Sequence, residues 1–217
     1  MVIMRSSNEH HNSQSALSRY AGPIVLAVGA YLAVAHLALW VVFTSHSDPA
    51  AMLADPIFRV LNLAYAAAFS GLAIAACAAY DKQARAAGTF GLVALCAAIV
   101  GTVNLGANMW FEGFAVPWLA DVVPEVLTAE KTMFWKVGYL SSYILFSIGW
   151  VLFGLASLRA RVFPRLISLA IVAGGIIGFL AARPPYGVAL GLALLSLGIW
   201  MVRTRKVTDT AAEPITA

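Results

Sequence analysis

The sequence predicts an all-α, polytopic membrane protein, a bundle of six transmembrane helices with an interfacial helical cap on its outer side. Of the 217 residues, 61% are hydrophobic and only 11% are charged, and the mean hydropathy is +0.84. A soluble domain carries roughly 25% charged residues, so this chain lacks the polar surface that water requires. The apolar residues form six runs of spanning length, and most basic residues lie in alternate connections between them.

The first apolar run, at 22–43, follows a polar tail at 1–21 that we expect to be disordered. The run is too long for a signal-peptide core and lacks a small-residue cleavage site, so it is predicted to remain as a spanning helix. The other predicted spans are 56–80, 88–109, 138–158, 166–182 and 186–202, before a second tail at 203–217. Each run is about 17 to 25 residues long, enough to cross a hydrocarbon core of about 30 Å.

The basic residues orient these spans. If the amino terminus lies inside, the inner segments hold ten Lys or Arg residues: Arg5, Arg19, Lys82, Arg85, Arg159, Arg161, Arg165, Arg203, Arg205 and Lys206. The outer segments hold four: Arg59, Lys131, Lys136 and Arg183. Because basic residues favour cytoplasmic loops, both termini of this multi-pass cell-membrane protein are predicted to be cytoplasmic. The net charge of +4 does not indicate nucleic-acid binding, since the basic residues are scattered rather than clustered on one face.

Local signals predict how the helices begin and pack. Asp48-Pro49 and Asp55-Pro56 each offer an N-cap followed by proline at the first helical position, and Asp55 is expected to pair with Arg59. Paired glycines in the last two spans, Gly174 with Gly178 and Gly187 with Gly191, predict close packing of a hairpin between them. Cys77 and Cys96 lack the spacing of a disulfide framework or metal site, and we interpret them as packing residues.

The segment 110–137 is predicted to fold back over the outer mouth of the bundle as the cap. Pro117 is expected to end the third span, because an interior proline removes a backbone hydrogen bond. Asp121 is then suited to cap a short helix that runs to about Lys131. Its apolar residues would be buried at the membrane interface or at the mouth of a pocket.

Polar side chains inside the spans predict a binding site in the outer half of the membrane. The candidate residues are His36, Asn62, Asn104, Asn108, Glu112, Tyr139 and Tyr143. Steps of four residues place Asn104, Asn108 and Glu112 on one helix face, expected to lie beneath the cap. Polar groups in lipid are costly unless they face a partner or a wet cavity, which favours an outward-opening pocket. The alternative is that they only join neighbouring helices, at about 0.6 kcal/mol per hydrogen bond.

Two segments carry a resemblance to known proteins: DPIFR at 55–59 and WFEGFAVPWLA at 110–120. With the six short Ala/Gly-rich spans, they resemble small bacterial polytopic membrane proteins of unknown function. The resemblance implies the same membrane topology, and no catalytic residues come with it.

The function remains open between two classes. The sequence has no HExxH, CxxC, P-loop or GxSxG motif, and only one histidine within a span, so no metal or cofactor is expected. In the first hypothesis the protein binds a lipid or small amphiphile in the outer pocket, or assists a membrane protein partner. In the alternative it is an intramembrane enzyme acting on a lipid or isoprenoid, with Glu112 or Asp121 as acid or base and His36 assisting.

Overall fold

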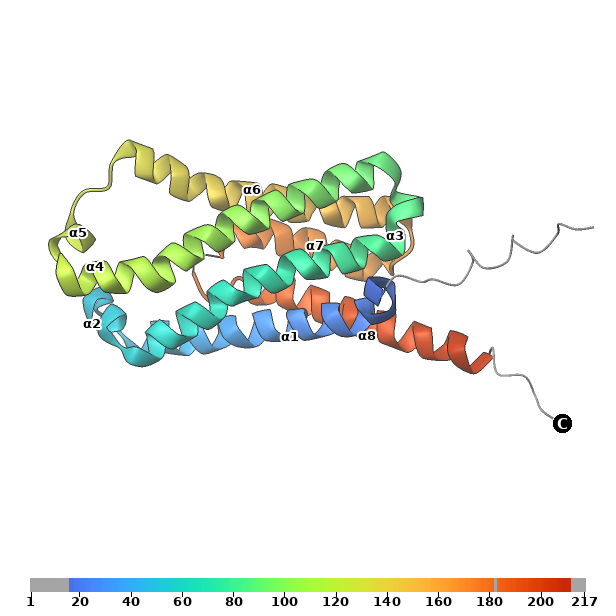
Figure 1. Ribbon diagram of the computed structural model, residues 1–217, viewed down its shortest axis with the longest axis horizontal. Coiled ribbons are helices and arrows are strands. Elements are labelled where there is room, and N and C mark those ends of the chain that lie inside the picture. Colours follow the sequence, from blue (N-terminus) through green and yellow to red (C-terminus); the bar gives the residue numbers. More distant parts are fainter. Residues whose placement is uncertain (1–15, 182, 212–217) are drawn as a thin grey trace, which may run out of the picture.

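The computed structural model describes residues 16–181 and 183–211, and these residues form helices joined by short connections (Figure 1). The elements are α1 (Ala16–Ser45), α2 (Pro49–Ala54), α3 (Pro56–Trp110), η2 (Phe111–Ala115), α4 (Val116–Val122), α5 (Glu125–Thr128), α6 (Met133–Ala160), α7 (Arg165–Ile177), η3 (Gly178–Leu180) and α8 (Val188–Ala211). The predicted all-α class is confirmed for this part of the chain. Most of the predicted disordered tail, residues 1–15, lies outside the described residues.

Four of the described helical stretches are long and apolar enough to cross a membrane. They are Arg19–Ser45, Pro56–Val122, Met133–Ala160 and Val188–Arg205, and Arg165–Leu180 is apolar but shorter. Large apolar side chains remain exposed along them, such as Val34, Val60 and Ile148, each at least half exposed. In water such surface would be unfavourable, whereas lipid accepts it, so the helices fit the predicted membrane protein.

Helix α3 contains a sharp reversal at Gly88. Its backbone there has φ 58° and ψ −153°, a conformation that glycine adopts at far lower cost than other residues. Figure 1 shows the two arms of α3, before and after this residue, running back along each other. The sequence predicted a connection at 81–87; instead the first arm stays helical through these residues, and Gly88 alone makes the turn. We call this end of the bundle the Gly88 end.

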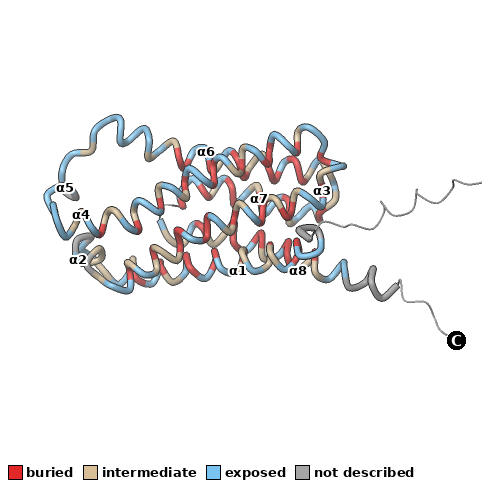
Figure 2. Tube along the Cα trace, viewed as in Figure 1, coloured by how far each residue is buried: buried red, intermediate tan, exposed pale blue. Residues whose placement is uncertain are grey.

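The first turns of α1, the α6–α7 connection and the last turns of α8 also lie toward the Gly88 end in Figure 1. The opposite end, which we call the α4 end, holds α2, α4, α5 and the start of α6. Figure 2 shows buried positions concentrated along the shared length of the helices, whereas α4, α5 and the first turns of α6 are mainly exposed. The hydrophobic core therefore lies along the shared length of the helices, and few residues at the α4 end are buried.

The α7–α8 hairpin stops well short of the α4 end (Figure 1). The carbonyl of Ala181, in its connection, accepts hydrogen bonds from His36 of α1 at 3.2 Å and Tyr65 of α3 at 3.3 Å. His36 precedes Ser45, the last residue of α1, by nine positions, and Tyr65 follows Pro56, the first residue of α3, by nine. At 1.5 Å per residue, the connection lies about 13 Å below the ends of both helices.

Glycines at several helix contacts let backbones meet closely. A Cβ on Gly174 would lie 2.8 Å from the Leu190 Cα, so the predicted packing of α7 on α8 is confirmed at this glycine. The other predicted glycines contact different helices. Gly178 faces the Phe146 ring of α6, Gly187 faces the His36 ring of α1, and Gly191 faces the Ala33 backbone of α1. They therefore fasten the hairpin to the rest of the bundle rather than to itself.

Polar contacts cross the interface between α3 and α6 at three levels. Asn108 donates to Ser142 Oγ at 3.2 Å, Trp150 Nε1 donates to Thr102 Oγ1 at 3.0 Å, and Gln83 Nε2 donates to Ser157 Oγ at 3.0 Å. These bonds satisfy groups that lipid could not, and they fix the register of the two helices.

The predicted cap is not confirmed, because the helix continues through Pro117. The five residues Phe111–Ala115 form a π-helical turn, in which the Val116 N–H donates to the Phe111 carbonyl. This wider turn precedes the proline and accommodates its ring and missing N–H without ending the helix. As a result α4 extends the line of α3 outward in Figure 1 instead of folding back over the bundle.

Candidate functional site

A cluster of hydroxyl and carboxyl groups lies between α3 and α6, toward the α4 end. The Tyr143 hydroxyl donates to the Tyr139 hydroxyl at 3.1 Å. The Glu112 carboxylate lies close enough to Tyr139 to interact with it electrostatically. Tyr65, from the first arm of α3, is close enough to Glu112 to interact with it electrostatically. We call Tyr65, Glu112, Tyr139 and Tyr143 the polar cluster. Three of the predicted site residues meet here.

The π-helical turn places Glu112. Gly113, the next residue, packs so closely against Leu63 that an added Cβ would lie 3.0 Å from its Cδ2. Leu63 follows Pro56 by seven positions, which puts this level about 10 Å below the start of α3. Glu112 itself is only partly exposed at this level.

His36 is fully buried and has backbone partners on both ring nitrogens. The Gly187 N–H donates to Nδ1 at 2.8 Å, which leaves the proton on Nε2, and Nε2 donates to the Ala181 carbonyl. Its ring also packs on the Tyr65 ring, with centroids 4.7 Å apart. His36 therefore links α1 to the α7–α8 connection, and neither nitrogen is free for proton transfer to a ligand.

Arg183 enters the site from the α7–α8 connection. It is exposed, although the carbonyl of Ala181 two residues earlier is held about 13 Å below the ends of α1 and α3. Arg183 lies close enough to Tyr139 to interact with it electrostatically. The phenol of Tyr139 thus lies within electrostatic range of two charged groups of opposite sign, the Glu112 carboxylate and the Arg183 guanidinium.

The predicted asparagines have three different surroundings. Asn108 is half-buried and bonded to Ser142, beside the polar cluster, and Asn62 is buried in the first arm of α3. Asn104 is exposed, and its amide donates to the Val100 carbonyl of its own helix at 2.8 Å. The expectation that Asn104 faces inward with Asn108 is wrong.

Aromatic rings frame the polar cluster on the α6 side. Trp135 stacks on Tyr139 with centroids 4.8 Å apart and planes 16° apart, and Tyr139 packs on Tyr143 at 5.0 Å. Lys131 lies over the Trp135 ring, 5.9 Å from its centroid. These contacts hold the Tyr139 phenol in place, so the cluster is organised before any ligand arrives.

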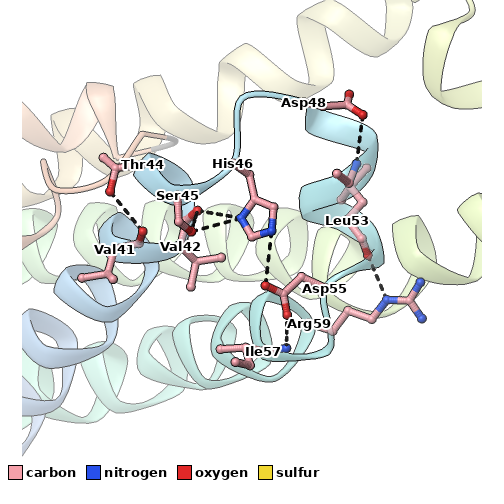
Figure 3. Close-up of polar contacts among 11 residues, drawn as sticks. Val41, Val42, Thr44, Ser45, His46, Asp48, Leu53, Asp55, Ile57 and Arg59 are labelled. Atoms are coloured by element: carbon pink, nitrogen blue, oxygen red, sulfur yellow. Dashed lines mark hydrogen bonds and ion pairs between the residues drawn. The ribbon is translucent and has the colours of Figure 1, made fainter.

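Figure 3 shows a separate network around α2. His46 Nδ1 lies 3.1 Å from the Val42 carbonyl, and its Nε2 lies 3.4 Å from the Asp55 carboxylate. Asp55 also accepts from the Ile57 N–H at 2.7 Å, and Asp48 accepts from the Ala51 N–H at 3.4 Å. Both predicted N-caps are confirmed, and the network joins the end of α1 to the start of α3.

Arg59 pairs with Asp121, not with Asp55 as the sequence predicted. Its guanidinium reaches the two Asp121 oxygens at 3.0 and 3.4 Å and donates to the Leu53 carbonyl at 2.9 Å. Asp121 therefore lies inside α4 as an ion-pair partner, and its predicted role as an N-cap is wrong; α5 begins at Glu125 after Pro124. The pair ties the exposed α4 to α2 and α3.

Two residues of the site are not among the predicted candidates. Tyr65 was not named, and Arg183 was counted only among the outer basic residues. The signal for Arg183 was the shortness of the last two apolar runs, because short helices place their connection below the neighbouring helix ends. Among residues 16–181 and 183–211, no three His, Cys, Asp or Glu side chains are grouped so that they could hold a metal ion.

Comparison with known proteins identifies no relative: no family model, no curated protein and no solved structure matches this chain. The resemblance to small bacterial membrane proteins therefore stays a prediction, and the functional argument rests on the site itself.

Proposed function

We propose that this protein is a six-span cell-membrane protein that binds a lipid or small amphiphile in a recess open to the outside. The spans are α1, the two arms of α3, α6, α7 with η3, and α8. We place this recess beyond the α7–α8 connection, with Glu112, Tyr139 and Arg183 at its border and the buried Tyr143 beside Tyr139. The protein would either bind the amphiphile as its own function or present it to a membrane complex that the protein assists.

Charge placement supports the orientation. The elements that meet at the Gly88 end carry most of the ten predicted inner basic residues, among them Arg85, Arg159 and Arg203. The α4 end carries Arg59, Lys131 and Lys136. The Gly88 end carries the larger share of basic residues, so it faces the cytoplasm under the positive-inside rule. Both termini then lie in the cytoplasm, and the polar cluster opens outward.

The depth of the α7–α8 connection that carries Arg183 is the observation that carries the proposal. The backbone of the α7–α8 connection lies about 13 Å below the helix ends at Ala181, and Arg183, two residues on, is exposed. A charged side chain anchored at this level is unfavourable against hydrocarbon, and it is tolerated where water or a polar headgroup reaches it. Glu112 at a similar level adds a second charged group, and exposed apolar side chains on the flanking helices suit acyl chains. The contacts favour binding over catalysis, because His36 has no free nitrogen and Asp121 is paired with Arg59.

Native mass spectrometry of the detergent-purified protein tests this proposal. We expect one amphiphile per chain to survive detergent exchange in the wild type. Replacing Arg183 with tryptophan should expel it, because the larger side chain occupies the recess. Tryptophan at Arg205, an exposed arginine on α8 at the Gly88 end, is the matched control and should leave the adduct in place. Absence of any bound amphiphile from the wild type, or its retention in the Arg183 variant, would contradict the proposal.

A further inference from the structure

The connection between α6 and α7 presents three exposed arginines close together in the chain. They are Arg159 in the last turn of α6, Arg161 at its C-cap and Arg165, the first residue of α7. We call these three residues the arginine corner. Within the part of the chain whose side chains the structure describes, none of the three forms an ion pair. The sequence from 131 to 208, which includes all of α6 and α7, contains no Asp or Glu.

The bundle fixes the position of the arginine corner. Phe163, which lies within the connection, is buried and packs edge-on against Trp200 of α8, with ring centroids 5.8 Å apart. The Arg161 N–H donates to a backbone carbonyl one turn earlier in α6, at 3.1 Å. Arg159 lies over the Phe90 ring at the start of the second arm of α3, 5.8 Å from its centroid. The connection is therefore packed against both α3 and α8, and its charges are held at one place on the surface.

Arg161 occupies a backbone position that favours glycine. It ends α6 in the left-handed conformation, with φ 55° and ψ 23°. Helices commonly end with glycine in this conformation, because a Cβ makes it unfavourable. A strained residue at a position where glycine would complete the same turn indicates that its side chain has a use there.

Exposed apolar side chains follow the arginine corner toward the middle of the bundle. Leu155 precedes Arg159 by four residues and Leu169 follows Arg165 by four, so each shares a helix face with its arginine. Leu155 is 41% exposed, Leu169 is 50% exposed and Leu166 is 81% exposed. Acyl chains can lie along these faces while a headgroup meets the guanidinium groups. A soluble anion would gain nothing from the leucines, so the surroundings favour a lipid.

We propose that the arginine corner binds the phosphate of an anionic phospholipid in the leaflet at the Gly88 end. A guanidinium suits a phosphate because it offers several N–H donors in a fixed fork. Basic residues beside membrane helices attract anionic lipids, and each raises the affinity about fivefold. The lipid supplies the negative charge that α6 and α7 lack. This site lies at the opposite end of the bundle from the proposed recess and does not depend on it.

Competition between lipids in native mass spectrometry tests the inference. Full-length protein in detergent is offered an equal mixture of anionic phosphatidylglycerol and net-neutral phosphatidylethanolamine with the same acyl chains. The wild type is expected to retain phosphatidylglycerol preferentially. Arg165→Gln should lower this preference about fivefold. Arg161→Gly should lower it by a similar factor and yet unfold at no lower temperature than the wild type, because glycine relieves the strained turn.

Arg19→Gln is the matched control, because Arg19 is exposed at the same end of the bundle but belongs to α1, which packs on α3 and α8. It removes the same charge and should keep the wild-type preference. Arg183→Trp, which fills the proposed recess, should also keep it, so that failure of one site is distinguishable from failure of the other. A wild type without preference, an unchanged preference in Arg165→Gln, or an equal loss in Arg19→Gln overturns the inference. Glycerophosphoglycerol, which lacks acyl chains, should not displace the bound lipid at equal concentration; displacement would overturn the lipid source.

Discussion

Replacing His36 with leucine is expected to lower the free energy of unfolding by about 2 kcal/mol or more. Leucine leaves the Gly187 N–H without the acceptor that His36 Nδ1 provides at 2.8 Å, inside a fully buried contact. It also detaches α1 from the connection that carries Arg183. Unfolding of the purified protein in detergent measures the change. His36→Gln, whose amide can supply both an acceptor and a donor, should lose less.

A double-mutant cycle with Tyr65 sharpens this prediction. The Ala181 carbonyl accepts from both His36 and Tyr65, so Tyr65→Phe alone leaves it one donor and should cost about 1 kcal/mol. The double variant removes both donors and should cost more than the sum of the single changes. Strict additivity, or a His36→Leu protein as stable as the wild type, would show that His36 does not hold the connection.

Replacing Gly29 with alanine is expected to destabilise the protein by about 1 to 3 kcal/mol, because the added methyl group has no room. A Cβ at Gly29 would collide with the Leu195 backbone nitrogen and would lie 2.8 Å from the Gly191 carbonyl oxygen. Backbone atoms cannot rotate away as a side chain can, so α1 and α8 must separate. The thermal midpoint of unfolding in detergent reports the loss.

Gly138→Ala is the matched control for Gly29. It lies within α6, and a Cβ there would meet no atom within 4 Å. Alanine favours a helix interior over glycine by about 1 kcal/mol, so this variant should be as stable as the wild type or more so. Equal stability of the two alanine variants would mean that α1 and α8 do not meet at Gly29.

The helical fold follows from features that a sequence displays directly. Apolar runs of spanning length became helices, and Asp48 and Asp55 became N-caps, because both effects act over a few neighbouring residues. The reversal at Gly88 was misplaced because the basic residues before it suggested a loop, yet they are compatible with a helix that projects toward the Gly88 end. The basic residues indicated which part of the chain lies at the turn. The residue at which the chain reverses is set by the backbone conformation that glycine can adopt.

The site was predicted only in part, for geometric reasons. Steps of four residues drift by about 40° each around a helix, which separates Asn104 from Glu112 before the π-helical turn shifts the face again. Pro117 was expected to end a helix, but a wide turn just before it removed the conflict. The pairing of Arg59 with Asp121 and the position of Arg183 depend on contacts between distant segments, which local patterns do not encode.

Accessibility of single cysteines in intact cells tests the outward-opening recess most directly. In a protein whose Cys77 and Cys96 are replaced by alanine, Arg183→Cys should react with a small membrane-impermeant thiol reagent added outside. Ser47→Cys, exposed after α1, should react faster, and Arg85→Cys, exposed at the Gly88 end, should react only after permeabilisation. Reaction of Arg183→Cys only after permeabilisation, or only after denaturation, would contradict the account.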